Sequence, residues 1–239
     1  MWRGLALVLA AGVAPTFAET PLPLPAVVAA ELTAPTDRYD HAVLGDGVEW
    51  GGLRLTIDTC PPCADRRLQA LVITLPETRV FEDVEARVVD VTGDGLAEVA
   101  VVETDLQRGA ALAVYDGSGR RIATPFIGQR HRWLAPAGVG DFDGDGQIEI
   151  AYVDRPHLRK ELVFVRLEGD RLQRVGRIPN LTNHRIGDDF ITGGLRNCGG
   201  GDALVLASGD WANAMVVTMA GAQAAGPVDR IPALLDCRD

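Results

Sequence analysis

The stretch from residue 141 to residue 149 has the residue types and the spacing to bind a hard metal ion. An oxygen donor stands at every second position, and Gly144 and Gly146 allow the tight turns that wrapping an ion requires. The predicted ligands are four carboxylates and one backbone carbonyl, from Asp141, Asp143, Asp145, Gln147 and Glu149. Carboxylates this close repel one another without a cation, and Ca²⁺ accepts flexible oxygen coordination more readily than Mg²⁺ does. The residues therefore predict a Ca²⁺ site; the alternative is an Asp- and Gly-rich turn without a metal.

A second stretch, residues 90–98, repeats this spacing with one change. The predicted ligands again stand at alternate positions, with Leu96 contributing its backbone carbonyl: Asp90, Thr92, Asp94, Leu96 and Glu98. Threonine at the third position removes one negative charge but keeps an oxygen donor. We therefore expect a second, weaker Ca²⁺ site here.

Both stretches belong to a longer pattern that recurs about every fifty residues. Four times an acidic residue opens a short apolar run that is followed by another such run, at Asp40, Glu98, Glu149 and Asp202. The intervals between these residues are 58, 51 and 53 residues. The predicted repeats cover residues 24–83, 84–132, 133–182 and 183–232, and a C-terminal tail covers residues 233–239.

Each repeat is predicted to form short antiparallel strands. Apolar residues partly alternate with polar ones, and residues 116–119 and 168–170 are typical of hairpin turns. Helical periodicity is nearly absent after residue 18. One four-stranded sheet per repeat indicates an all-β fold, a small β-propeller of about four four-stranded blades with Ca²⁺-binding loops between strands. A β-sandwich built from the same strands is the alternative.

Residues 139–153 resemble the FG-GAP/VCBS repeat, which occurs in integrin α-subunit propellers and in exported bacterial VCBS repeat-containing proteins. Its pattern is an apolar residue and glycine, then Asp-x-Asp-x-Asp-Gly, an acidic ligand and an apolar strand. The resemblance implies β-propeller blades with Ca²⁺ held between the first two strands. It covers residues 84–155 well, whereas the outer repeats keep only parts of the motif, so we expect no metal there.

Residues 1–18 are predicted to be a secretory signal peptide, with a positive Arg3, an apolar stretch and small residues before a cut at Glu19. The remaining domain, residues 19–239, is expected to be periplasmic or secreted, and no later apolar run is long enough for a membrane span. Loss of Arg3 changes the formal charge from −10 to −11. Such an acidic protein is a poor partner for nucleic acid or anionic lipid.

Export makes disulfide bonds plausible for the four cysteines. Cys60 and Cys63 are close enough for a local pair, which would leave Cys198 and Cys237 to pair with each other. Crossed pairings stay open. A redox role for the Cys-x-x-Cys motif is the alternative, but such centres usually need a helix N-terminus, and this motif follows a predicted strand.

Catalytic motifs are scarce. The sequence has no Gly-x-Ser-x-Gly and no His-Glu-x-x-His, and its four histidines are scattered along the chain. We expect ordinary surface residues at His41, His131, His157 and His184; the alternative is that they converge on one face of the propeller. A local basic stretch offers a candidate contact for an anionic ligand or partner, formed by Arg130, Arg132 and Trp133. An inter-blade salt bridge explains the same residues equally well.

The sequence thus predicts a Ca²⁺-binding, non-catalytic binding or scaffold module. Its expected partner is a protein or glycan at the cell envelope. The alternative is a periplasmic hydrolase or lyase that uses acidic residues at the propeller centre.

Overall fold

The computed structural model describes residues 25–238, and about half of these residues are in β-strands. Within this described part the only helical segments are a 3₁₀ turn, η1 (Val228–Arg230), and a short α-helix, α1 (Ile231–Leu235). The all-β prediction is therefore confirmed. The predicted signal peptide, residues 1–18, lies outside the described residues.

The first of three antiparallel sheets has eight strands, in the order β1-β2-β4-β6-β7-β8, with β3 paired to β2 and β5 paired to β6. Its strands are β1 (Ala26–Thr36), β2 (Glu49–Asp58), β3 (Leu68–Thr74), β4 (Arg79–Phe81), β5 (Arg87–Val89), β6 (Glu98–Asp105), β7 (Gly109–Tyr115) and β8 (Arg121–Ala123). Strand β4 joins its two halves, because it pairs with β2 at one residue and with β6 at three.

The second sheet is a meander of four consecutive strands in the order β12-β11-β10-β9. Its strands are β9 (Leu134–Gly140), β10 (Glu149–Asp154), β11 (Glu161–Glu168) and β12 (Arg171–Pro179). The third sheet has five strands, in the order β13-β15-β16-β17 with β14 paired to β15. Its strands are β13 (Leu181–Thr182), β14 (Gly194–Asn197), β15 (Asp202–Ser208), β16 (Asn213–Thr218) and β17 (Gly221–Pro227).

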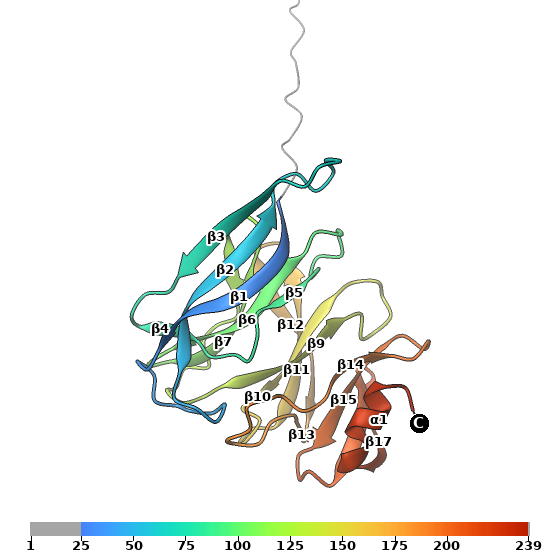
Figure 1. Ribbon diagram of the computed structural model, residues 1–239. Helices are drawn as coiled ribbons and strands as arrows, with labels where there is room; N and C mark the ends of the chain where they lie inside the picture. The colour runs from blue at the N-terminus through green and yellow to red at the C-terminus, as the bar shows by residue number, and fades with distance from the viewer. Residues whose placement is uncertain (1–24, 239) are drawn as a thin grey trace, which may run out of the picture.

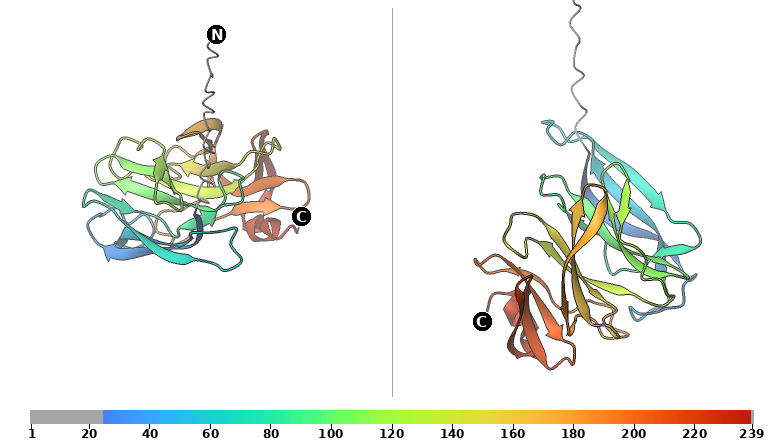
Figure 2. Two further views of the ribbon diagram at one scale, coloured as in Figure 1. Left: turned by 90° about the horizontal axis from the view of Figure 1, so that it is seen from above. Right: turned by 180° about the vertical axis from the view of Figure 1, so that it is seen from behind.

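The sheets follow one another in chain order along an arc, from β1–β3 at one end to β17 and α1 at the other (Figures 1 and 2). Neighbouring sheets pack face to face. Leu112 of β7 and Ile150 of β10 share one buried cluster, and Phe164 of β11 and Leu206 of β15 share the next. No closed ring is detected among the described residues, and the predicted number of blades is not established by the arrangement.

The two ends of the arc differ in how they meet solvent. At the N-terminal end, Leu68 and Val72 of β3 are 53% and 59% exposed. At the C-terminal end, Ile231 and Leu234 of α1 are buried against β15 and β16. Residues 233–239, expected as a plain tail, therefore begin inside a helix that covers the last sheet.

Two disulfide bonds are present, Cys60–Cys63 in the β2–β3 connection and Cys198–Cys237. The second bond ties the end of α1 to the connection before β15. This is the pairing favoured by the sequence, with none of the crossed alternatives. Among residues 25–238, no helix is long and apolar enough to cross a membrane.

Candidate metal centre

The loop of residues 141–149 joins β9 to β10 and is organised around Asp141. Its Oδ1 accepts the backbone N–H of Gly144 at 2.7 Å, and its Oδ2 accepts that of Gly146 at 2.9 Å. Both glycines have positive φ, 78° and 85°, so an L-residue would be strained at either position. Burial alone would raise the pKa of Asp141, but these N–H groups outweigh it and lower the pKa.

Glu149 closes the loop from the first position of β10, where it is fully buried. Its Oε2 accepts the backbone N–H of Phe142 at 3.0 Å. One carboxylate oxygen from each of Asp141, Asp143 and Glu149 lies within 4.8 Å of the others, a spacing that could hold a metal ion. Asp145 stands apart from this triad, and its Oδ1 accepts the N–H of Gln147 at 2.8 Å.

Arg166 of β11, which sequence reasoning missed, supplies a cation from inside the protein. It pairs with Glu149 across the β10–β11 ladder, and its Nε donates to Glu149 Oε1 at 2.7 Å. Its two terminal nitrogens donate to Asp145 at 3.1 Å and to Asp143 at 3.3 Å. Three of the four predicted acidic ligands therefore share one guanidinium. Only the strand register could have revealed this residue in advance.

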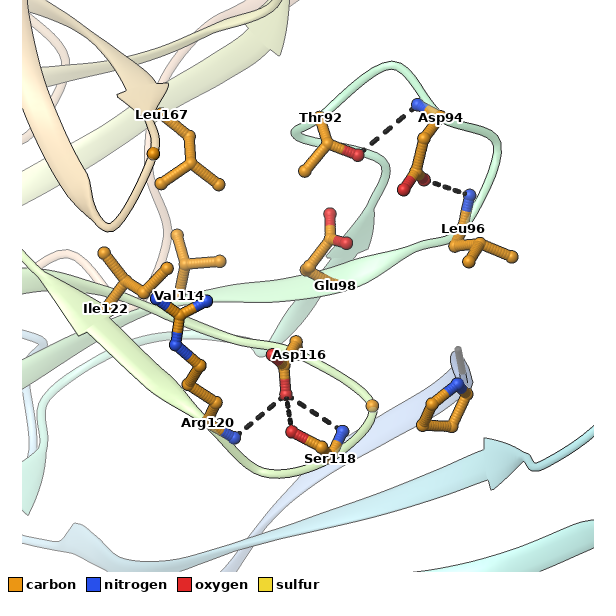
Figure 3. A pocket seen from close by; sticks show the side chains of 13 residues that line it. Thr92, Asp94, Leu96, Glu98, Val114, Asp116, Ser118, Arg120, Ile122 and Leu167 are labelled. Carbon is orange, nitrogen blue, oxygen red and sulfur yellow. Dashed lines mark hydrogen bonds between the residues drawn. The ribbon is translucent and has the colours of Figure 1, made fainter. Parts of the chain in front are cut away.

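The loop of residues 90–98, between β5 and β6, has the same construction. Asp90 Oδ1 accepts the N–H of Gly93 at 2.7 Å, and Oδ2 accepts that of Gly95 at 2.7 Å. Glu98 Oε2 accepts the N–H of Val91 at 2.9 Å, as Glu149 does from the residue after Asp141. Figure 3 shows Thr92, Asp94 and Leu96 around this turn, with the Glu98 carboxylate beneath them.

The second loop differs in the residue across the ladder. Val99 pairs with Tyr115, so the next residue, Asp116, stands where Arg166 stands in the other loop. A carboxylate thus replaces the guanidinium. Burial raises the pKa of Glu98 to about 7, and the charges of Asp94, Asp90 and Asp116 add to the increase. This loop holds its negative charge without an arginine in the matching position.

A pocket of about 220 Å³ opens beside the second loop (Figure 3). Its apolar wall includes Val114 and Ile122 from the first sheet and Leu167 from β11, so it lies between two sheets. Glu98 and Asp116 form part of its polar wall. A cation in the second loop would therefore be reachable from solvent.

The basic stretch forms no flat aromatic surface. Trp133 is 2% exposed, and its Nε1 donates to the backbone oxygen of Glu82 at 2.8 Å, so the ring belongs to the core. Arg130 is bound to Asp40 at 2.6 Å, and Arg132 donates to the backbone of the residue before it. The ligand patch expected from Arg130, Arg132 and Trp133 therefore lacks its aromatic part.

The four histidines lie close together in space, so the expectation of separate surface residues is wrong and the alternative of convergence holds. The rings of His41 and His131 stack with centroids 5.0 Å apart, and His157 Nε2 lies 2.9 Å from His184 Nδ1. His131 precedes β9 and His157 follows β10. His41 lies between β1 and β2, and His184 follows β13. Sequence distance hid this convergence because loops at one edge of successive sheets meet only after the sheets pack.

A group of buried acids lies behind these histidines. Glu82 is fully buried, and its Oε2 accepts the hydroxyl of Thr104 at 2.6 Å. Glu49 is 2% exposed, and burial raises its pKa to about 9, with Glu82 the next cause. Glu49 and Glu82 lie 33 residues apart in the chain, and the sequence gave no sign of their proximity.

The family described as FG-GAP-like repeat matches residues 90–152. This match begins at the first ligand position of the second loop and runs through the complete 141–149 loop into β10. It supports the FG-GAP part of the resemblance. No curated protein and no solved structure matches the chain. Fold and loops together define an all-β protein that carries an FG-GAP-like repeat with an acidic loop suited to a metal ion.

Proposed function

We propose that this protein is an exported, Ca²⁺-binding β-propeller-like module that binds or scaffolds a partner and has no catalytic activity. In this proposal each predicted repeat forms one blade, as the meander β9–β12 would. The partner is a protein or glycan at the cell envelope. The two disulfide bonds fit an oxidising compartment outside the cytoplasm.

The observation that carries the proposal is the acidic triad of Asp141, Asp143 and Glu149. Backbone N–H groups already orient Asp141 and Glu149, so little ordering would be needed when an ion binds. Oxygen ligands from carboxylates, a backbone carbonyl and water are the set that Ca²⁺ prefers. Calcium would replace Arg166 as the positive charge that balances these carboxylates. The role of calcium in this proposal is therefore mainly structural.

Thermal melting of residues 19–239 tests the calcium assignment. We expect millimolar Ca²⁺, but not Mg²⁺, to raise the melting temperature relative to EDTA. Occupancy at about a hundredfold above the dissociation constant would add roughly 2.7 kcal/mol of stability. Asp143→Ala combined with Asp145→Ala should abolish the shift. Asp170→Ala, at an exposed hairpin turn, is the matched control and should keep it.

The buried acids favour one alternative function, a periplasmic hydrolase or lyase. Glu49, with its raised pKa, is protonated at neutral pH and has the chemistry of a general acid. Turnover of a glycan substrate that is lost in Glu49→Gln would support the enzyme. Partner binding by the parent protein without any turnover would support the proposal of a non-catalytic binding module.

A further inference from the structure

The pocket of about 220 Å³ beside the second loop brings three kinds of chemical group together. Glu98 of β6 gives it a carboxylate, Arg120 of the β7–β8 turn gives it a guanidinium, and Leu167 of β11 belongs to its apolar wall. The acidic triad of the 141–149 loop does not line this pocket. A ligand bound here would therefore be separate from a calcium ion bound at the triad.

The apolar wall consists of Val114, Ile122 and Leu167. Val114 and Ile122 are partners in the β7–β8 ladder, and Leu167 joins them from the second sheet. All three belong to one hydrophobic cluster, in which Val114 is 2% exposed. Because this cluster is close-packed behind the wall, the wall keeps its shape. It would favour an aliphatic group of a ligand, since contact removes apolar surface from water.

The Glu98 carboxylate has one oxygen available for a ligand. Glu98 is 8% exposed, and its Oε2 accepts the backbone N–H of Val91 at 2.9 Å. Its Oε1 accepts no hydrogen bond from any of residues 25–238. Buried polar atoms normally have a hydrogen-bond partner. The free acceptor at the pocket therefore indicates a position for a donor group of a ligand.

Asp94 and Asp116 add two further carboxylates to the pocket. Asp94 Oδ1 accepts the N–H of Leu96 at 2.8 Å, and Asp116 Oδ1 accepts those of Ser118 and Arg120, each at 2.9 Å. Within the described part of the chain, the Oδ2 atoms of both aspartates accept no hydrogen bond. The local electrostatics therefore favour a positively charged group, such as a primary ammonium.

Arg120 is the only basic residue that lines the pocket. Its guanidinium forms no ion pair with a carboxylate of residues 25–238, although three carboxylates line the same space. Figure 3 shows the guanidinium on the Ile122 side of the pocket, away from Asp94. Arginine binds a carboxylate through two parallel hydrogen bonds. The pocket thus offers one position for an anionic group and another for a cationic group.

We propose that this pocket binds a free aliphatic α-amino acid of about the size of leucine. The ammonium group donates to Glu98 Oε1, the carboxylate accepts from Arg120, and the branched side chain packs on the apolar wall. A simple cation would meet Arg120 in the same space, and a simple anion would meet the three carboxylates, whereas a zwitterion complements both charges. The volume of about 220 Å³ is below the roughly 300 Å³ at which pockets for drug-sized ligands begin, which suits a small ligand.

Calorimetric titration of residues 19–239 with L-leucine tests the proposal. EDTA is present throughout, so that no metal ion occupies the second loop. Two matched probes are isocaproate, which is leucine without its amine, and isoamylamine, which is leucine without its carboxylate. Each should bind about tenfold or more weakly than leucine, because each loses one charge-assisted contact. No binding of leucine, or equal binding of either probe, would overturn the proposal.

Two variants assign the charged contacts. Arg120→Gln, at an exposed turn, should weaken leucine binding about tenfold or more but should not weaken isoamylamine binding. Glu98→Gln should weaken both; if it does not fold, Arg120→Gln and the two probes still decide. Unchanged leucine affinity in Arg120→Gln would overturn the proposal.

Arg177→Gln is the matched control, because this arginine is 59% exposed on β12 and does not line the pocket. It should leave leucine affinity unchanged, and loss of binding in this control would overturn the proposal. Failure of the calcium experiment would leave the leucine result intact, since the triad lies outside the pocket and leucine is titrated without calcium.

Discussion

Arg166 lies directly opposite Glu149 in the β10–β11 ladder, and its Nε donates to Glu149 Oε1 at 2.7 Å. The guanidinium therefore sits among the carboxylates that the sequence assigns to Ca²⁺. In the second loop the corresponding position holds Asp116. Two loops of nearly the same sequence thus balance their charge differently, one with an internal cation and one without.

Arg166→Gln should make the protein depend more strongly on Ca²⁺. Removing one partner leaves the fully buried Glu149 without its counter-charge, which should cost about 3 kcal/mol in EDTA. Ca²⁺ would then meet no competitor and should restore most of this loss. Urea denaturation of parent and variant, with and without Ca²⁺, measures both effects. Equal calcium-induced stabilisation in the two proteins would show that Arg166 and the ion do not share a site.

Glu98 should make stability depend on pH. Its pKa is about 7 in the folded protein and 4.5 without these surroundings, so the folded state holds the extra proton between these values. The free energy of unfolding should therefore fall as pH rises from about 4.5 to 7. Glu98→Gln should reduce this fall, and Ca²⁺ should reduce it in the parent protein by favouring the ionised form. Denaturation at pH 5 and pH 7 in EDTA compares the parent protein with Glu98→Gln. The same change in the free energy of unfolding between these pH values in both proteins would contradict the raised pKa of Glu98.

Glu49→Gln should stabilise the protein at neutral pH. Folding forces Glu49 to take up a proton at pH 7, because its pKa rises to about 9. The neutral amide avoids this cost, and we expect a gain of about 2 kcal/mol at pH 7 that shrinks toward pH 5. Glu77→Gln, at an exposed carboxylate, is the control. A loss of stability at pH 7 would mean that Glu49 is ionised in the folded protein.

The Cys198–Cys237 bond should matter more than the Cys60–Cys63 bond. It spans 39 residues rather than 3 and holds α1 over the last sheet. Replacing Cys198 and Cys237 by serine should cost about 4 kcal/mol, against about 2 kcal/mol for the other pair. Melting temperatures of the two double variants test this order. A larger loss of stability for the Cys60 and Cys63 pair would contradict this order and would mean that the β2–β3 connection depends more on its disulfide bond than α1 does.

Local sequence was a good guide to local structure. Short apolar runs led to strands such as β10 and β11, and the Asp-Gly spacing led to two loops that share one hydrogen-bonding pattern. These features depend on neighbouring residues, so the pattern that specifies them is contiguous. Closure of the ring was harder to predict from the sequence, because it depends on how the first and last sheets meet. In the structure, α1 covers the last sheet.

The sequence by itself determined the β-class of the fold, the acidic loops and the short reach of Cys60 to Cys63. Only the tertiary structure decided that Arg166 faces Glu149, that Trp133 is buried, and that the four histidines converge. Each of these relationships joins residues on different strands or loops, and strand register and sheet packing set such distances. Packing energy is summed over whole sheet faces and does not depend on one local motif. No short stretch of the chain therefore predicts these three relationships.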